Sequence, residues 1–295
     1  MSRRLDHVVL AARDLEAQAE VFRHMGFRVG ARNAHPWGTQ NHIVQFANTF
    51  LELICAPAPY HAPVDPDPRT FSFAAFVHDF VQTREGAAMI ALTGADAQAD
   101  AHAFHELGMG DYEPFHFERR GQRANGDPTR VGFTLAFASA RTMPDVGFFT
   151  CAHQHPQNFW DQDLQAHANA VTSVTKVTLV AENPADHAEF LSNFTQLRDY
   201  RSSSMGIEFA LGDGQIVEVL TPVAYGFHFG EQALSHAHAA PHAAPHIAAL
   251  ELRTSSLESA RQALTGGRIA HTQNRGRLVV QASHACGVTL AFAAL

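Results

Sequence analysis

The stretch Leu5-Asp-His-Val-Val-Leu10, taken together with Phe50-Leu-Glu-Leu-Ile54, decides the fold that this chain predicts. Each is an apolar run of strand length that carries an ionisable side chain in its middle, His7 in the first and Glu52 in the second. A buried imidazole and a buried carboxylate cost free energy unless each finds a partner. A divalent cation held between the two strands would satisfy both, so His7 and Glu52 form the first candidate functional pair.

The order of elements around this pair recurs three more times along the chain. Each unit predicts one strand, one helix with apolar residues at helical spacing, and three further strands; Gly26 ends the first helix. The predicted strands lie at 6–12, 28–32, 41–46 and 49–55; at 86–93, 112–119, 130–138 and 146–152; at 173–181, near 200, at 207–211 and 215–220; and at 247–253, near 269, at 277–282 and 287–293. The predicted helices lie at 15–25, 95–107, 184–195 and 256–264.

Four βαβββ units predict an α+β fold with mixed sheets, in which the modules group as two pairs. We expect modules 1 and 2 in residues 1–157, a linker at 158–170, and modules 3 and 4 in residues 171–295. The segments 56–69 and 225–246 are expected to be loops. Because the second segment is rich in histidine, capture of a metal ion is the alternative to a flexible loop there.

The composition of the chain excludes several classes of protein. Of its 295 residues, 46% are apolar and 17% are charged, so it can build sizeable cores. The formal charge of −8 without a basic cluster argues against nucleic acid, and no apolar run is long enough to span a membrane. Cys55, Cys151 and Cys286 form no metal or disulfide motif, which predicts a reducing, cytoplasmic location. We expect the N-terminus to be mature sequence, since it lacks the apolar stretch of a signal peptide.

Several motifs of the first module resemble the vicinal oxygen chelate superfamily, and within it the glyoxalase-like domain proteins. The motifs are Leu5-Asp-His-Val-Val-Leu10, Asp14-Leu15, His35-Pro-Trp-Gly-Thr-Gln-Asn41 and Phe50-Leu-Glu-Leu-Ile54. The superfamily includes glyoxalase I, extradiol dioxygenases, methylmalonyl-CoA epimerase and bleomycin-resistance proteins. The resemblance implies that two modules form a cup of curved sheet. It also implies metal ligands on the first and last strands of a module, where His7 and Glu52 fall.

The second module departs from the family pattern at the ligand positions. Its first-strand position falls at Ala87, Ala88 or Met89, and its last-strand position near Phe149 or Thr150. None of these is a good ligand for a hard divalent cation, so a complete four-ligand site is absent on this alignment. A three-ligand site needs a local substitute. His42 completes the predicted set with His7 and Glu52, and the open alternatives are His116, His153 and His155.

The third module provides an internal comparison with the first. Lys176 takes the place of His7, and Glu218 the place of Glu52, so this pair could bind a ligand or form a buried ion pair without a metal. Module 4 offers Ala249 and roughly Phe292, which are not ligands, so the second domain is expected to be a degenerate copy. Thr39 and Asn41, in a turn that enters a strand, are further candidates for binding a ligand; capping of that turn is the alternative.

These features predict a metal-dependent enzyme that acts on a small molecule with vicinal oxygens. Fe²⁺, Mn²⁺, Ni²⁺ or Zn²⁺ on His7 and Glu52 would stabilise a developing oxyanion, or Glu52 would act as the base. Isomerase, lyase and dioxygenase remain open. The alternative is a metal-free binding or resistance protein, which the missing ligands favour, and a third is a structural module with filled cups. We expect a small-molecule partner, no nucleic acid or membrane, and a monomer or homodimer.

Overall fold

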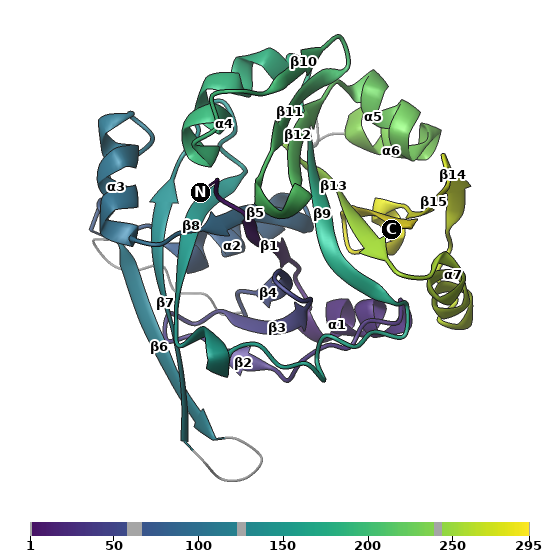
Figure 1. The fold of residues 1–295 in the computed structure, drawn as a ribbon, viewed down its shortest axis with the longest axis horizontal. Helices are drawn as coiled ribbons and strands as arrows, with labels where there is room; N and C mark the ends of the chain where they lie inside the picture. The colour runs from purple at the N-terminus through teal and green to yellow at the C-terminus, as the bar shows by residue number, and fades with distance from the viewer. Residues whose placement is uncertain (1, 58–66, 123–127, 239–243, 295) are drawn as a thin grey trace.

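Two eight-stranded mixed sheets build the molecule (Figure 1). The computed structural model describes residues 2–57, 67–122, 128–238 and 244–294. The strand order is β2-β3-β4-β1-β5-β8-β7-β6 in the first sheet and β10-β11-β12-β9-β13-β16-β15-β14 in the second. Each sheet thus joins two βαβββ modules through their first strands, β1 with β5 and β9 with β13, which run antiparallel. The predicted α+β fold of four paired modules is confirmed.

The first sheet contains the strands of modules 1 and 2. They are β1 (Leu5–Ala11), β2 (Asn33–Ala34), β3 (Gln40–Gln45), β4 (Phe50–Cys55), β5 (Gly86–Thr93), β6 (Phe115–Gln122), β7 (Pro128–Ala138) and β8 (Gly147–Gln154). Helices α1 (Leu15–His24) and α3 (Ala97–Glu106) follow the first strand of each module. Asp14 and Asp96 cap these helices by accepting hydrogen bonds from backbone N–H groups of the first turn.

The second sheet repeats this arrangement. Its strands are β9 (Val171–Val180), β10 (Arg201–Ser203), β11 (Gly206–Ala210), β12 (Ile216–Leu220), β13 (His246–Thr254), β14 (Thr272–Asn274), β15 (Arg277–Val280) and β16 (Thr289–Ala294). Helices α4 (Ala188–Thr195) and α7 (Leu257–Gly266) follow β9 and β13. Short 3₁₀ turns lie at Pro156–Asn158, Pro184–His187, Gly212–Gly214 and Ala282–His284.

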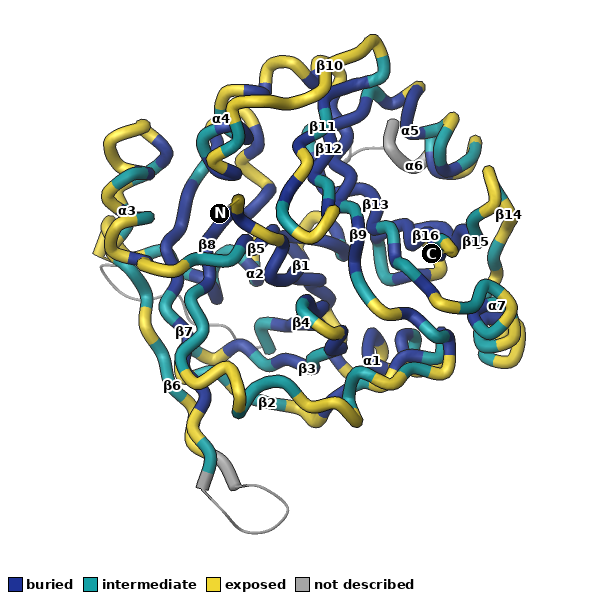
Figure 2. Tube along the Cα trace, viewed as in Figure 1, coloured by how far each residue is buried: buried dark blue, intermediate teal, exposed yellow. Residues whose placement is uncertain are grey.

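Alternation along the strands separates the main core from the inner face of each sheet. In β1, Val8 and Leu10 belong to the large core shared by both halves, whereas Val9 belongs to a separate cluster on the opposite face. Figure 2 shows that the strands at the centre of the molecule are buried. The first-module strand that carries His7 therefore lies between two packed layers.

Two predictions about local structure were wrong. Residues 28–32 form no strand; the edge strand is β2, only two residues long. The segment 225–246 is not a loop throughout, since its described part contains the end of α5 (Pro222–Phe229), α6 (Glu231–His238) and the start of β13. Pro222 at the first turn and the Thr221 hydroxyl, which accepts from the Ala224 N–H, start α5. Residues 239–243 of this His-rich segment, for which metal capture was the alternative, lie outside the described residues.

Each half inserts helical structure after its fourth strand, on the inner face of the sheet. In the first half this is α2 (Phe73–Thr83), which the sequence did not predict and which packs Phe73 and Val77 against the inner-face cluster. In the second half α5 and α6 occupy the equivalent place. Tyr225 of α5 is fully buried, and its hydroxyl bonds Thr289 Oγ1 at 2.9 Å and the Ala248 carbonyl at 3.1 Å.

Close backbone approaches join the two halves. A Cβ on Gly287 would lie 2.0 Å from the Glu85 carbonyl oxygen, and a Cβ on Gly267 would lie 1.8 Å from the His24 carbonyl oxygen. Both contacts link an element of module 4 with an element of the first half. Glycine is therefore required where these segments meet.

Candidate functional site: the cup of the first sheet

The inner face of the first sheet lines a cavity of about 280 Å³. His7 from β1 and Glu52 from β4 reach it together with Asn41 from β3, because alternation directs all three to the same face. Seven aromatic side chains form much of its apolar wall: Trp37, Phe50, Phe73, Phe117, Phe133, Phe149 and Phe159. The cavity thus combines an apolar wall with a few polar groups, as small-molecule sites commonly do.

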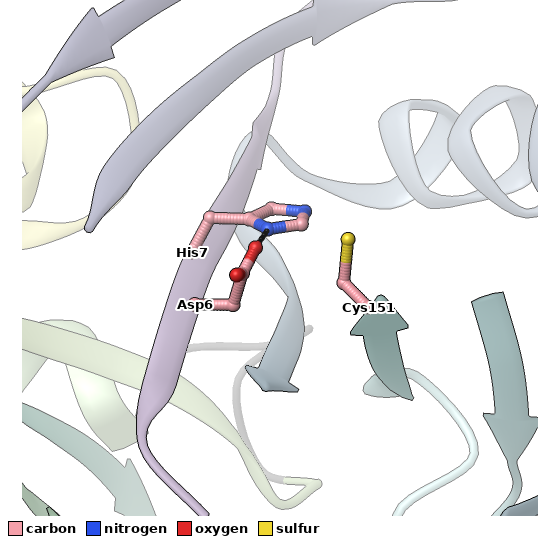
Figure 3. A group of neighbouring side chains, drawn as sticks. All are labelled: Asp6, His7 and Cys151. Carbon is pink, nitrogen blue, oxygen red and sulfur yellow. Dashed lines mark hydrogen bonds and ion pairs between the residues drawn. The ribbon is translucent and has the colours of Figure 1, made fainter. Parts of the chain in front are cut away.

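The imidazole of His7 is hydrogen-bonded to the buried carboxylate of Asp6 (Figure 3). Its Nδ1 lies 2.6 Å from Asp6 Oδ1, and His153 Nε2 lies 2.9 Å from Asp6 Oδ2. Asp6 is 4% exposed; burial raises its pKa, but the bonds from His153 and His7 outweigh this and hold it well below the usual range. The ring of His7 also stacks on Phe50, with centroids 4.2 Å apart. The imidazole is therefore fixed in position and orientation.

Glu52 lies among neutral and cationic groups. Asn41 donates its amide N–H to Glu52 Oε1. His7 Nε2 lies 3.9 Å from Glu52 Oε2, and His35 Nε2 lies 3.8 Å from Glu52 Oε1. Arg119 is exposed and also lines the cavity. Its positive charge attracts the carboxylate of Glu52. The carboxylate therefore has partners within the chain itself.

His35 joins the polar groups to the aromatic wall. Its Nδ1 lies 2.8 Å from Thr39 Oγ1, and its ring stacks on Trp37 with centroids 4.4 Å apart. Burial lowers the pKa of His35, while Glu52 raises it and Arg119 lowers it. The imidazole is therefore biased towards its neutral form.

The structure brings together some predicted site residues and separates others. His7, Glu52 and Asn41 line the cavity, and fully buried Thr39 reaches it only through His35. His42 does not belong with them: its Nδ1 bonds the Gly30 carbonyl at 2.7 Å and its Nε2 lies 3.2 Å from Glu16, on the α1 side of the sheet. Alternation explains this, since His42 lies between Asn41 and Ile43, which both line the cavity.

The remaining histidine candidates also lie away from Glu52. His116, an exposed residue of the edge strand β6, bonds Thr134 of the neighbouring strand β7. His153 reaches Asp6 but is not among the residues that line the cavity. His155 lies beyond the end of β8 with a left-handed backbone (φ 61°), so it does not share a strand face with His153.

Sequence and structure comparisons fit this architecture. The family model of the glyoxalase-like domain matches residues 5–195. The chain belongs to the glyoxalase-like domain family. This family assignment and the paired βαβββ modules confirm the vicinal oxygen chelate superfamily that the motifs indicated. No curated protein matches the chain in sequence.

Solved structures share the fold of this glyoxalase-like protein over nearly its whole length. A hypothetical protein from Staphylococcus aureus has a TM-score of 0.64 at 12% identity and covers 99% of this chain and 100% of its own. A mutant of 4-hydroxymandelate synthase from Streptomyces coelicolor has a TM-score of 0.57 at 12% identity and covers 99% and 91%. At this identity the likeness concerns the fold. No described helix is long and apolar enough to cross a membrane.

The strand register of this glyoxalase-like protein identifies the positions from which module 2 would supply metal ligands. Met89 of β5 pairs with Gly147 of β8 as His7 pairs with Phe50, so Met89 is the counterpart of His7. Phe149 lies two residues beyond Gly147 and is the counterpart of Glu52. Both residues were among the predicted positions. Two of the four family positions thus carry side chains that are poor ligands for a hard divalent cation.

A third donor near His7 is Cys151. One ligand atom each from Asp6, His7 and Cys151 lies within 4.8 Å of the other two, so this group could hold a metal ion (Figure 3). Burial raises the pKa of the Cys151 thiol well above its ordinary value, and the charges of Asp6 and Glu52 raise it further. A metal ligand must be the thiolate, and Asp6 already accepts from two imidazoles. The residues present therefore do not fit the metal site of the superfamily.

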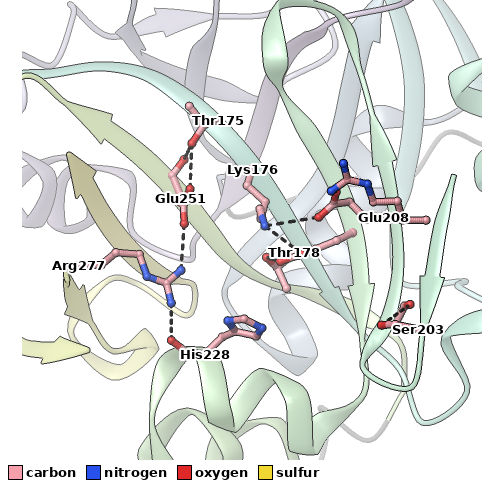
Figure 4. A network of polar contacts seen from close by, with 11 residues as sticks. Thr175, Lys176, Thr178, Ser203, Glu208, His228, Glu251 and Arg277 are labelled. Carbon is pink, nitrogen blue, oxygen red and sulfur yellow. Dashed lines mark hydrogen bonds and ion pairs between the residues drawn. The ribbon is translucent and has the colours of Figure 1, made fainter. Parts of the chain in front are cut away.

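The second cup has the same register but different side chains (Figure 4). Lys176 pairs with Ile216 as His7 pairs with Phe50, and Glu218 lies two residues on, as Glu52 does. Lys176 Nζ lies 3.1 Å from Glu218 Oε2, and Thr178 donates to the other carboxylate oxygen. The predicted substrate-binding pair is thus an ion pair with its groups satisfied.

Module 4 offers no ligand at the corresponding positions. Ala249 pairs with Thr289 as Lys176 pairs with Ile216, so Ala249 is the counterpart of Lys176. Ala291, next to the predicted Phe292, is the counterpart of Glu218. Across β9 and β13, Lys176 pairs with Glu251. Arg277 neutralises Glu251 at 2.9 Å and donates to the His228 carbonyl at the end of α5 (Figure 4). The second cup is therefore a network of ion pairs held against an inserted helix.

Sequence reasoning missed four residues of the first site. The sequence could have indicated Asp6, because it adjoins His7 in a buried strand and a buried carboxylate needs a hydrogen-bond donor. His35 was quoted only as part of a motif. Arg119 and Cys151 come from β6 and β8, far along the chain, and no local pattern connects them with His7. Their roles depend on the strand order of the sheet.

Proposed function

We propose that this chain binds a small, planar, largely apolar molecule in the cup of the first sheet, and that it does so without a metal ion. The observation that carries the proposal is the cavity lined by aromatic side chains whose polar end is formed by His7 and Glu52. The walls suit a flat ring, because aromatic side chains favour offset or edge-to-face contact with another ring.

The charge balance of the cup supports a metal-independent site. Asn41 and Arg119 stabilise Glu52, and Asp6 accepts a hydrogen bond from Nδ1–H of His7. No divalent cation is needed to remove an unsatisfied buried charge. His7 Nε2 and Glu52 Oε2 remain directed towards each other at 3.9 Å, with room to engage a ligand or accept a proton from it.

A metal-assisted enzyme acting on vicinal oxygens is the second candidate. The 3.9 Å separation of His7 Nε2 and Glu52 Oε2 favours it, because two donors at that separation can share one cation. His7 and Glu52 would then be two protein ligands, with water or substrate completing the coordination. This candidate function requires a metal ion that binds even though β5 and β8 provide no ligands at the corresponding positions.

The first experiment is elemental analysis of untagged protein after dialysis, followed by calorimetric titration of naphthol in the presence of EDTA. We expect far less than one transition metal per chain and saturable binding of one naphthol per chain. One metal per chain that disappears in Glu52→Gln would replace the proposal with the enzyme candidate.

A blocking variant tests where the ligand binds. Ile43 lines the cavity, so Ile43→Trp should fill it and abolish binding. The control is Val223→Trp, at a position that is 73% exposed on α5. Circular dichroism of both variants establishes that they fold. Equal binding by folded Ile43→Trp and wild type would show that the ligand lies elsewhere.

A further inference from the structure

The carboxylate of Asp6 determines which nitrogen of His7 faces the cup. Each carboxylate oxygen of Asp6 lies within hydrogen-bond distance of an imidazole nitrogen, and a carboxylate accepts hydrogen bonds. The imidazoles of His7 and His153 must therefore both donate to it, His7 through Nδ1–H and His153 through Nε2–H. In a neutral imidazole the other nitrogen is an acceptor. His7 Nε2 consequently presents a lone pair to the cavity.

The distance to Glu52 agrees with this tautomer. A protonated Nε2 would be drawn into a charge-assisted hydrogen bond with the carboxylate, at roughly 2.7–2.9 Å. The observed separation from Glu52 Oε2 is 3.9 Å, which is too long for a hydrogen bond. Two acceptors thus lie side by side at the polar end of the cup, and neither donates to the other.

Two of the neighbouring donors are already engaged. The Asn41 amide donates to the second oxygen of Glu52, and the Cys151 thiol donates towards Asp6. Arg119 is exposed and faces Glu52. His35 Nδ1 is paired with Thr39. A ligand that reaches His7 Nε2 and Glu52 Oε2 therefore meets hydrogen-bond acceptors.

We propose that the cup selects flat aromatic molecules whose inner end donates hydrogen bonds, namely aryl amines and hydroxyls, over the same rings ending in an ether or a carboxylate. This rests on the proposed function. The polarity is opposite to that of a chelating site, where a metal ion attracts oxygen lone pairs of the ligand. His7 and Glu52 accept the hydrogen bonds that the ligand donates. Asp6 acts as a positioning residue, because its hydrogen bond sets the tautomer of His7.

Matched naphthalene derivatives test the proposal by isothermal calorimetry. Naphthol and naphthylamine should bind at least about tenfold more tightly than methoxynaphthalene, because the ether leaves two buried acceptors unpaired. Naphthoate should bind weakest of the four, because its charge adjoins Glu52. Equal affinity for naphthol and methoxynaphthalene would overturn the inference while leaving the proposed site in place. No binding by any of the four compounds would overturn the proposed function itself.

Asp6→Asn tests the tautomer. Asparagine can donate to His7 Nδ1, which moves the ring proton to Nε2 and turns the acceptor into a donor. The preference for naphthol over methoxynaphthalene should then fall several-fold or reverse, and the nitrogen-15 spectrum of His7 should show the changed tautomer. The control is Asp79→Asn, at a side chain that is 78% exposed. A folded Asp6→Asn protein with unchanged preference and unchanged tautomer would refute the role of Asp6.

Discussion

The contact between Gly267 and His24 gives a sharp test of how the two halves are joined. In Gly267→Ala the new Cβ would lie 1.8 Å from the His24 carbonyl oxygen, whereas real Cβ contacts essentially never fall below 3.0 Å. The ends of α1 and α7 must therefore separate by more than an ångström. Overpacking of this kind costs about 1–3 kcal/mol, a large part of the roughly 5–15 kcal/mol that stabilises a domain.

The neighbouring Gly266 is a matched control. Its Cβ would meet nothing within 4 Å, and it lies in the last turn of α7, so Gly266→Ala should stabilise by about 0.4–1 kcal/mol. Urea unfolding of both variants, followed by circular dichroism, measures the difference. If Gly267→Ala unfolds at the same urea concentration as Gly266→Ala, the close approach of α1 and α7 is wrong.

Three further predictions concern stability and metal dependence. Tyr225→Phe should lower the free energy of unfolding by about 1–3 kcal/mol, because Thr289 Oγ1 loses a buried partner; thermal unfolding measures this, and an unchanged midpoint would contradict it. Burial lowers the pKa of His35 and of His167, so the unfolded chain takes up protons first as the pH falls below the ordinary histidine value of 6.5. Stability should therefore decrease from pH 7 to pH 5, by up to about 1.4 kcal/mol per pH unit for each histidine, and urea midpoints that rise over this range would refute the sign. Prolonged dialysis against EDTA should leave both the unfolding midpoint and naphthol binding unchanged, whereas a loss that Zn²⁺ or Fe²⁺ restores would favour the metal-dependent candidate.

Much of the fold was predictable because strands and helices carry their own local signals. Apolar alternation located β1, β4 and β5, and glycines marked the helix ends. The helix α2 was missed because the Pro- and Asp-rich segment before it suggested that the loop continued. The helix α5 was missed because Gly226 and the His-rich segment that begins at His228 weaken the helical pattern. Tyr225 and Phe229 overcome this weakness by packing into the second cup.

The candidate site was predictable only where its residues come from one module. Strand alternation within residues 5–55 places His7, Glu52 and Asn41 on the cavity face of the sheet. The same alternation, correctly applied, places His42 on the opposite face and so excludes it from the site. The absence of a ligand for a hard divalent cation on β5 was predictable from its composition alone, since its counterpart of His7 is Met89. The hydrogen bonds that Asp6 makes with His7 and His153 were not predictable from the sequence. They depend on β8 lying next to β5, so that His153 reaches the carboxylate that also binds His7.

The glycine contacts between the halves have a consequence for how this protein responds to dilution. The second sheet packs against the first as a partner subunit would, but both sheets belong to the same chain. Such tethering replaces a concentration-dependent association with a fixed, high effective concentration. The packing that supports the first cup from the side of α7 and β16 therefore cannot dissociate as the protein is diluted. Ligand affinity measured at nanomolar protein should equal that measured at micromolar protein.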